Sequence, residues 1–312
     1  ERSGYAVYFY SQDGTELGGI SMSGTYDGGP LSMAITSNDD MVITGSGPQY
    51  LDLDPGPGLS LAQPGNNGLH SPFIQRWTHS GTQVYHRRLT GPGSGTISDV
   101  AVDGTGDIVV VGTIDFSDLD LDPTGSDAPV SNVGNTNPMF LAKYDADGGL
   151  LWGFNSGDSS YMMLPVRPEM VLGADNSIYI TGAFGYMDLD PGPGVDPLTS
   201  NAGDGFLLRY LSDGSLAWGL NVTMGLGSNS EGYALDIDAN GHVLVLGRWN
   251  SVAHFNPTAP DLVWYAGASS GQYITMYDSG TGAFQGLATW SGALFIHPFA
   301  LNVHRNGDIV LS

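Results

Sequence analysis

Paired aspartates recur in one motif of the sequence, Asp-Leu-Asp-Pro. Its acidic residues are Asp52 and Asp54, Asp120 and Asp122 (with Asp118 extending this pair), and Asp188 and Asp190. Side chains two residues apart on an extended segment point to the same face, so each pair holds two like charges close together. The Pro and Gly residues that follow turn the chain and can bring backbone carbonyls to the same side. Hard oxygen ligands in an irregular loop suit Ca²⁺, so the motif is a candidate structural calcium site.

The same aspartates have a second possible use that needs no metal. They can cap turns, accept backbone N–H bonds, or pair with cations. Arg76, Lys143 and Arg209 occupy one register of a repeated strand, which makes them candidate partners for one Asp of each motif. In the last full repeat the pair is replaced by His254 and Asn256, and we expect that loop to bind a cation weakly or not at all.

Catalysis by paired acids is a third interpretation of the motif. A glycosidase needs two carboxylates roughly 5 to 9.5 Å apart across the bond that it cleaves. Catalysis needs one asymmetric site, so a pair that is repeated three times favours a structural role. The sequence has no HExxH motif, no phosphate loop and no cysteine. We therefore predict no catalytic or cofactor-binding residues.

A separate candidate site lies where the repeat breaks down, in the segment AHFNPTAPDLVWYAG. Trp249 and Trp264 fall outside the repeat register there, as does Trp290 further on. Aromatic rings that are exposed in an asymmetric loop can stack on sugars or dock a protein partner. We therefore take Trp249 and Trp264 as possible ligand or partner contacts.

A repeated hairpin must position all of these residues. Short aromatic segments end at Tyr10, Trp77, Tyr144, Tyr210 and Tyr277, at spacings of 67, 67, 66 and 67 residues. Each segment is followed by a polar turn with Gly and by a second short strand, which predicts a β-hairpin. Another hairpin, rich in β-branched residues, precedes every one except the first, and the long Asp-Leu-Asp-Pro loop lies between the two hairpins.

Four short strands in each period indicate a β-propeller, with one four-stranded blade per period. The four full blades are expected at residues 33–91, 99–157, 170–225 and 234–292. Residues 5–24 form only the second hairpin of a unit and residues 297–312 only the first, so we expect them to combine into one composite blade. The sequence therefore predicts an all-β chain that forms a single five-bladed propeller over residues 1–312, closed by its terminal hairpins.

The charge balance excludes several classes of protein. The chain has 28 Asp and 4 Glu against 8 Arg and one Lys, and its net charge is −23 at pH 7. Such a chain repels phosphate backbones, so nucleic acid is not an expected partner. No apolar run approaches the ~18–20 residues of a membrane helix, so membrane insertion is not expected. The shortage of Glu and Lys, together with 47 Gly, fits an all-β chain with many turns.

The loop Asp-Leu-Asp-Pro-Gly-Pro-Gly, followed by a Phe-Leu-x-Arg/Lys-Tyr strand, an Asp-Gly turn and a Trp, resembles the tandem β-propeller repeats of secreted bacterial proteins, the SBBP-type repeats. The resemblance covers essentially the whole chain. It implies the propeller fold and an extracellular or cell-surface location in a bacterium, but it says little about activity, because such propellers host many roles. The chain begins at Glu1 without a Met, so we expect a mature form or a fragment.

These features favour a non-enzymatic role. We expect an extracellular or cell-surface scaffold for assembly or adhesion, in which Ca²⁺ can brace the long loops. Its expected partners are other copies of the protein or surface glycans. Two alternatives stay open, a lectin-like glycan-binding module and a carbohydrate-active hydrolase or lyase. An aromatic-lined pocket would indicate the first, and acids that converge in a central funnel would indicate the second.

Overall fold

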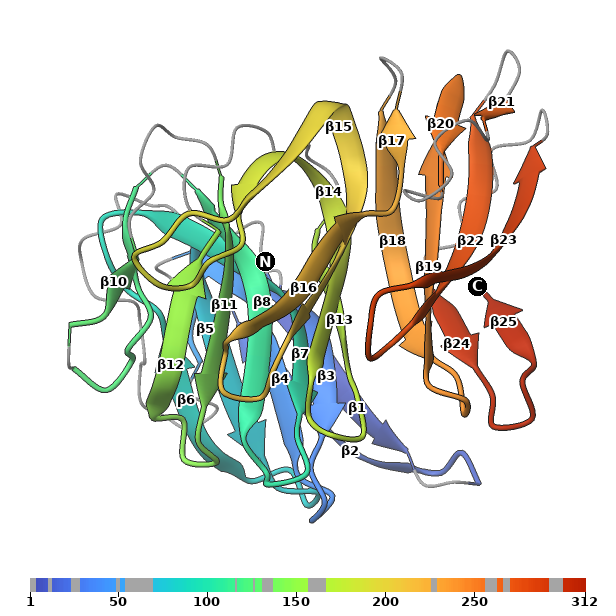
Figure 1. Cartoon of the computed structure of the whole chain (residues 1–312). Helices are drawn as coiled ribbons and strands as arrows, with labels where there is room; N and C mark the ends of the chain where they lie inside the picture. The colour runs from blue at the N-terminus through green and yellow to red at the C-terminus, as the bar shows by residue number, and fades with distance from the viewer. Residues whose placement is uncertain are drawn as a thin grey trace. The chain divides into compact units, whose positions relative to one another are not determined.

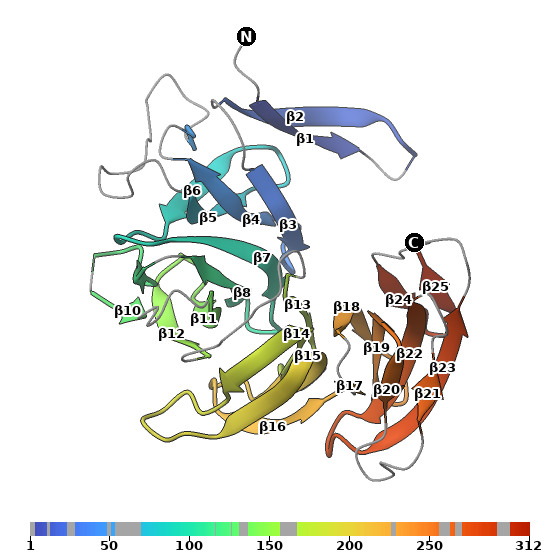
Figure 2. The same cartoon turned by 90° about the horizontal axis from the view of Figure 1, so that it is seen from above.

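The computed structural model of the chain consists of strands and turns in two compact units (Figure 1, Figure 2). The described residues are 4–10, 13–23, 29–48, 51–53, 70–115, 117–125, 127–130, 137–156, 167–225, 229–255, 263–265, 270–291 and 300–312. Over these ranges the chain forms no helix, and thus none that is long and apolar enough to cross a membrane. The predicted all-β class is confirmed for this part of the chain.

The first unit comprises residues 1–135 and 140–155. Its first sheet has the strand order β3-β4-β5-β6, with β3 Gly29–Ile35, β4 Met41–Pro48, β5 His70–Trp77 and β6 Gln83–Arg88. Its second sheet has the order β12-β11-β8-β7, with β7 Ser94–Val102, β8 Ile108–Asp115, β11 Met139–Tyr144 and β12 Leu150–Asn155. Two hairpins accompany them, β1 Gly4–Tyr10 with β2 Glu16–Ser23, and β9 Leu119–Asp120 with β10 Pro129–Val130.

The second unit comprises residues 136–139 and 156–312. The third sheet has the order β13-β14-β15-β16, with β13 Glu169–Leu172, β14 Ile178–Asp188, β15 Pro197–Tyr210 and β16 Leu216–Asn221. The fourth has the order β18-β19-β22-β23, with β18 Ser230–Ile237, β19 His242–Trp249, β22 Gly271–Asp278 and β23 Phe284–Ser291. Smaller sheets are formed by β17 Met224–Gly225, β20 Val252–His254 and β21 Trp264–Tyr265, and by β24 Leu301–Val303 with β25 Ile309–Leu311.

Each full period of the sequence thus folds into one four-stranded antiparallel sheet, as the repeat predicts. The hairpins near the two ends form separate two-stranded sheets, β1–β2 and β24–β25. The composite blade, the closed five-bladed propeller and the single domain over residues 1–312 therefore stay predictions.

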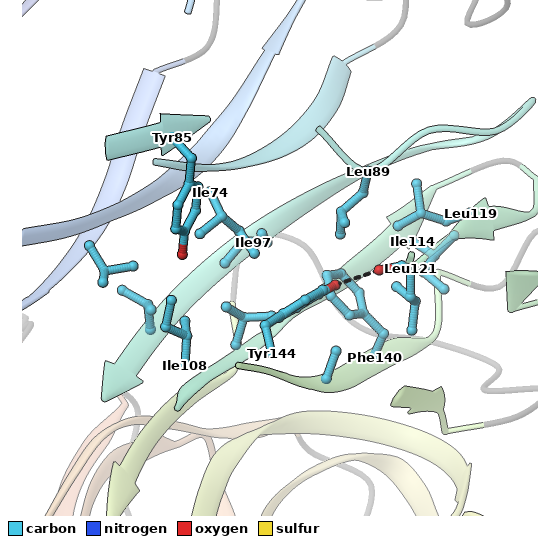
Figure 3. Close-up of a cluster of buried hydrophobic side chains, with 14 residues drawn as sticks. Ile74, Tyr85, Leu89, Ile97, Ile108, Ile114, Leu119, Leu121, Phe140 and Tyr144 are labelled. Carbon is cyan, nitrogen blue, oxygen red and sulfur yellow. Dashed lines mark hydrogen bonds between the residues drawn. The ribbon is translucent and has the colours of Figure 1, made fainter. Parts of the chain in front are cut away.

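The core of the first unit lies between its two sheets, which stand side by side in both views (Figure 1, Figure 2). Buried side chains from both sheets meet there, including Ile74 and Tyr85 from the first and Ile97, Ile108 and Tyr144 from the second (Figure 3). Burying one large apolar side chain contributes about 1.5–3 kcal/mol. The strands of these two successive repeats are rich in β-branched residues, and they therefore stabilise one another through the core between the two sheets.

A glycine in the second strand of each sheet lies against an aromatic ring of the third strand. The pairs are Gly45 with Phe73, Gly112 with Phe140, Gly182 with Phe206 and Gly247 with Tyr273. A Cβ atom at Gly112 would overlap the carbonyl oxygen of Thr96 and lie 2.6 Å from the Phe140 ring. The glycine that ends the apolar run of each repeat is therefore required by packing.

We predict that Gly112→Ala lowers the free energy of unfolding of the first unit by about 1–3 kcal/mol, because overpacking shifts the strand and the ring. Gly286→Ala is the control, since the nearest atom to its added methyl is the flexible Met276 Cε at 3.4 Å. Thermal and urea unfolding followed by circular dichroism measure both effects. Equal stability of the two variants would contradict the packing argument.

Candidate functional site

The Asp-Leu-Asp-Pro loop of the second sheet is closed by its own hydrogen bonds. Oδ1 of Asp120 accepts the N–H groups of Asp122 and Ala128, both at 3.0 Å, and so joins the two ends of the loop. Oδ1 of Asp122 accepts the N–H and the hydroxyl of Thr124 at 2.8 and 2.6 Å. Both carboxylates thus take the place of water as acceptors for the backbone N–H groups of a turn. This is the usual local role of Asp.

The loop of the third sheet repeats these bonds at equivalent positions. Oδ1 of Asp188 accepts the N–H groups of Asp190 at 3.1 Å and Asp196 at 2.9 Å. Oδ1 of Asp190 accepts the N–H of Gly192 at 2.7 Å. The first Asp therefore holds the loop ends together, and the second forms the turn after it.

The leucine between the two aspartates points into the core, and its carbonyl needs a donor there. Leu121 is 0% exposed and Leu189 4% exposed. The hydroxyl of Tyr144 donates to the Leu121 carbonyl at 2.8 Å (Figure 3), and that of Tyr210 donates to the Leu189 carbonyl at 3.3 Å. We call the aspartate bonds together with this bond the loop clasp. Burial and then the carboxylates of the clasp raise the pKa of both tyrosines.

In the first sheet, different residues donate to the equivalent leucine carbonyl. Its third strand ends in Trp77, which has no hydroxyl. The side-chain amides of Gln75 and Gln83 instead donate to the buried carbonyl of Leu53, at 3.0 and 2.8 Å. Different side chains therefore supply the hydrogen-bond donor that the buried carbonyl needs.

The fourth sheet has an incomplete clasp. Phe255 replaces the leucine and is also 0% exposed. The hydroxyl of Tyr277, which stands where Tyr144 and Tyr210 stand, has no hydrogen-bond partner of normal geometry within the described ranges. Burial raises the pKa of Tyr277, and the nearby Thr275 side chain partly opposes this. His254 lies in β20, while Asn256 lies outside the described residues.

These contacts bear on the predicted calcium ligands. Asp54 lies outside the described residues, whereas Asp52, Asp118, Asp120, Asp122, Asp188 and Asp190 lie within them. Across the described ranges no group of three or more His, Cys, Asp or Glu side chains is placed to hold a metal ion. Hydrogen bonds to backbone donors account for four of these aspartates. Calcium binding stays a prediction.

The predicted partners of the repeated cations were wrong. The observed ion pairs are Arg76–Asp40 at 2.9 Å, Lys143–Asp103 at 2.7 Å, Lys143–Asp107 at 3.1 Å and Arg209–Asp175 at 2.9 Å. All these aspartates lie in or beside the turn before the second strand, outside the Asp-Leu-Asp-Pro loops. Antiparallel pairing explains this, because Arg76 stands opposite Val42, close to that turn.

Two of these cations also reach the turn of a neighbouring sheet within their own unit. Nη1 of Arg76 donates to the carbonyl of Ala146 at 2.7 Å, and Nη1 of Arg209 donates to the carbonyl of Gly280 at 3.1 Å. Both carbonyls belong to the turn between the third and fourth strands of the following sheet. One guanidinium therefore joins an acidic turn of its own sheet to the next sheet.

Arg88 is the cation that interacts electrostatically with a motif aspartate, Asp52. It was not identified from the sequence. Burial lowers the pKa of Arg88 to about 10, and Asp52 opposes this shift. The Arg88 guanidinium also donates to the carbonyl of Leu51. Arg88 is the last residue of β6 and stands opposite Phe73, where the third sheet has Asn221 opposite Phe206. The repeat alignment therefore offered a signal, since a cation takes the place of an amide there.

The structure corrects the expectation for Trp249 and refines that for Trp264. Trp249 is 2% exposed and packs edge-on against Phe255 at 5.2 Å between ring centroids, so it presents no face to a ligand. Trp264 is half-buried, with its ring centroid 5.6 Å from that of Phe255. The next residue, Tyr265, is 74% exposed. The exposed aromatic ring of this hairpin is thus one that the sequence did not single out.

A polar cluster lies at the start of β18, and it has no counterpart among the described residues of the other sheets. Glu231 is 7% exposed and forms an ion pair with Arg248. The hydroxyl of Tyr233 donates to the Glu231 carboxylate at 2.7 Å. Tyr233 sits where the register of β18 and β19 shifts, and such a bulge re-aims a side chain. Two protein groups, Arg248 and Tyr233, thus hold the Glu231 carboxylate, and the Tyr273 hydroxyl donates to the backbone carbonyl of the same residue at 3.0 Å.

Comparison with known proteins assigns no family to the chain. No protein-family profile and no curated protein matches it. Among solved structures it is similar to a protein of unknown function from Bacteroides caccae, with 9% sequence identity and a TM-score of 0.36. The match covers 93% of this chain and 92% of that one. A likeness of this size carries no functional argument.

We predict that Tyr144→Phe lowers the free energy of unfolding by about 1–3 kcal/mol, because it leaves the buried Leu121 carbonyl without a donor. Tyr277→Phe is the matched control, since its hydroxyl has no such acceptor, and we expect it to change stability little. Urea unfolding of both variants measures the difference. A loss of equal size in the control would show that the clasp bond is not the cause.

We predict that EDTA leaves the melting temperature of protein purified without chelator unchanged to within about 1 °C. The physical reason is that backbone N–H groups already occupy Oδ1 of Asp120 and Asp188. Melting curves with EDTA and with added Ca²⁺, together with elemental analysis, check this. Bound calcium and a melting temperature that falls by several degrees in EDTA would restore the calcium interpretation.

Proposed function

We propose that the protein is a non-enzymatic scaffold that works by contact with other molecules through its long loops. The observation that carries the proposal is that a fixed loop or hairpin presents an exposed apolar side chain at two places in the second unit. Such contacts are typical of recognition by loops on a rigid framework.

The first of these side chains is Val195, in the loop of the third sheet. Val195 is 68% exposed, although it lies inside the loop that the Asp188–Asp196 bond closes. The second is Tyr265, which is 74% exposed beside the half-buried Trp264. Because both backbones are held by neighbouring contacts, little conformational entropy is lost when a partner binds.

The fold proposed for this scaffold is a five-bladed β-propeller. Four successive sheets with one strand order support it, and each terminal hairpin packs on a sheet of its own unit. Ile20 of β2 packs with Met41 and Ile43 of β4, and Leu301 of β24 packs with Leu244 and Leu246 of β19. These are the contacts that two halves of a fifth blade would make with its neighbours.

The location and ligands follow from the resemblance and the composition. We infer an extracellular or cell-surface place in a bacterium, and other copies of the protein or surface glycans as partners. The net charge of −23 keeps molecules apart at low salt, so contacts between copies should strengthen as salt screens it.

A lectin-like module is the second candidate. The exposed ring of Tyr265, supported by Trp264 and Phe255, favours it, because sugar rings stack on exposed aromatic faces. Under this function Tyr265 binds glycan and Val195 has no role in binding.

The test compares Val195→Asp and Tyr265→Ala with Leu151→Ala, a control whose side chain is 51% exposed on β12. We expect either test variant to weaken self-association about tenfold in sedimentation equilibrium, which corresponds to about 1.4 kcal/mol. All three should keep the normal melting temperature. Unchanged association in both test variants would reject the proposal, and a selective loss of glycan binding in Tyr265→Ala would favour the lectin-like function.

A further inference from the structure

The turns β3–β4, β18–β19 and β24–β25 share one backbone pattern, and each carries an exposed asparagine at the same position. These residues are Asn38, Asn240 and Asn306. In each turn the N–H of the residue after the asparagine donates to the carbonyl two residues before it, at 3.0, 3.1 and 2.8 Å respectively. The three asparagines therefore have similar backbone bonds and similar access to water, and their neighbours distinguish them.

The residue that follows the asparagine is the first difference. Gly241 follows Asn240, whereas Asp39 follows Asn38. Both following residues have a positive φ, 82° at Gly241 and 62° at Asp39. Because glycine has no Cβ, the backbone nitrogen of Gly241 is open to approach by the Asn240 side chain, while the Cβ of Asp39 crowds the equivalent nitrogen.

The bonds of the side-chain amide are the second difference. Asn306, which also precedes a glycine, donates from Nδ2 to Asp308 Oδ2 at 2.7 Å, and its Oδ1 accepts the Asp308 N–H at 3.2 Å. The backbone N–H of Asn240 donates to Asp238 Oδ1 at 2.8 Å, but the Asn240 side chain forms no hydrogen bond with the described residues. Its amide can therefore turn toward the Gly241 nitrogen without breaking a bond.

We infer that Asn240 is a site of spontaneous deamidation. The Gly241 nitrogen loses its proton and attacks Cγ of Asn240, so an N–Cγ bond forms, the Cγ–Nδ2 bond breaks, and Nδ2 leaves as ammonia with a proton. Water then opens the succinimide ring at either of its carbonyls, which gives aspartate or isoaspartate at position 240. Water is the co-reactant, and asparagine is among the thermolabile residues of proteins. The reaction does not depend on the proposed scaffold function.

The turn that holds Asn240 also joins the fourth sheet to the third within the second unit. The carbonyl of Gly241 accepts the N–H of Ser279 at 3.0 Å. The carbonyl of Ser279 in turn accepts the hydroxyl of Tyr179, on β14, at 3.0 Å. Isoaspartate adds a methylene group to the backbone directly before Gly241 and so displaces its carbonyl. Deamidation at Asn240 therefore loosens a joint between two sheets.

Peptide mapping by mass spectrometry tests the site in the full chain. The protein is incubated in mildly alkaline buffer below its melting temperature, and the loss of the three amides is followed with time. We expect Asn240 to deamidate at least tenfold faster than Asn38, because of the open glycine nitrogen. It should react several-fold faster than Asn306, which must first break its side-chain bonds. A rate at Asn240 that does not exceed both others would overturn the inference.

A reciprocal exchange of the following residue isolates the effect of the glycine. Gly241→Asp is tolerated by the turn, because Asp39 already has this conformation and the nearest atom to the added Cβ is Ser279 Oγ at 3.4 Å. We expect this variant to slow deamidation of Asn240 about tenfold, and Asp39→Gly to speed deamidation of Asn38 about tenfold. An unchanged rate in either variant would contradict the proposed reaction.

Asn240→Gln is the control for the effect on the joint between sheets, since glutamine must close a larger ring and reacts far more slowly. Both proteins are aged together, and their melting temperatures are compared before and after. We expect the melting temperature of the unchanged chain to fall by several degrees and that of Asn240→Gln to stay constant. An equal fall in the two proteins would show that deamidation at Asn240 does not loosen the joint.

Discussion

The buried carbonyl group in the middle of three of the long loops is the constraint on which the shape of those loops depends. A leucine must enter the core at this point to cover the sheet, and its backbone then leaves water. The structure supplies a donor from the third strand in two sheets and from two glutamines in another. Once the carbonyl is bonded, the aspartates on either side are fixed, and they in turn hold the loop ends. The shape of the loop is therefore determined by a hydrogen bond in the core.

The repeated part of the fold could be predicted from the sequence because its signals are local. The spacing of aromatic strand ends, with a hairpin rich in β-branched residues before each of the last four, predicts four-stranded sheets, and Asp with Pro and Gly predicts the turns. The role of Gly112 was less visible, because a glycine after an apolar run shows its purpose only when Phe140 lies above it. Whether the sheets close into a ring depends on contacts that no single repeat encodes.

Two site predictions failed because they required knowledge of pairing between strands. Arg76 was assigned to the long loop, but antiparallel register sets it beside the preceding turn and Asp40. Trp249 was expected to be exposed because it breaks the repeat. It stands opposite Gly271, and the missing side chain there leaves room for the indole ring in the core. Loss of repeat consensus indicates a change in packing as readily as a binding surface.

The guanidinium group of Arg76 links the first sheet to a turn of the second, and that of Arg209 links the third sheet to the equivalent turn of the fourth. The first and third repeats thus supply the donor, and the second and fourth repeats supply the acceptor. A duplication that inserts two successive periods, one with the donor and one with the acceptor, would bring such a joint with it. The length of such a protein can therefore change in evolution by pairs of repeats, without this bond between their sheets having to arise anew by mutation.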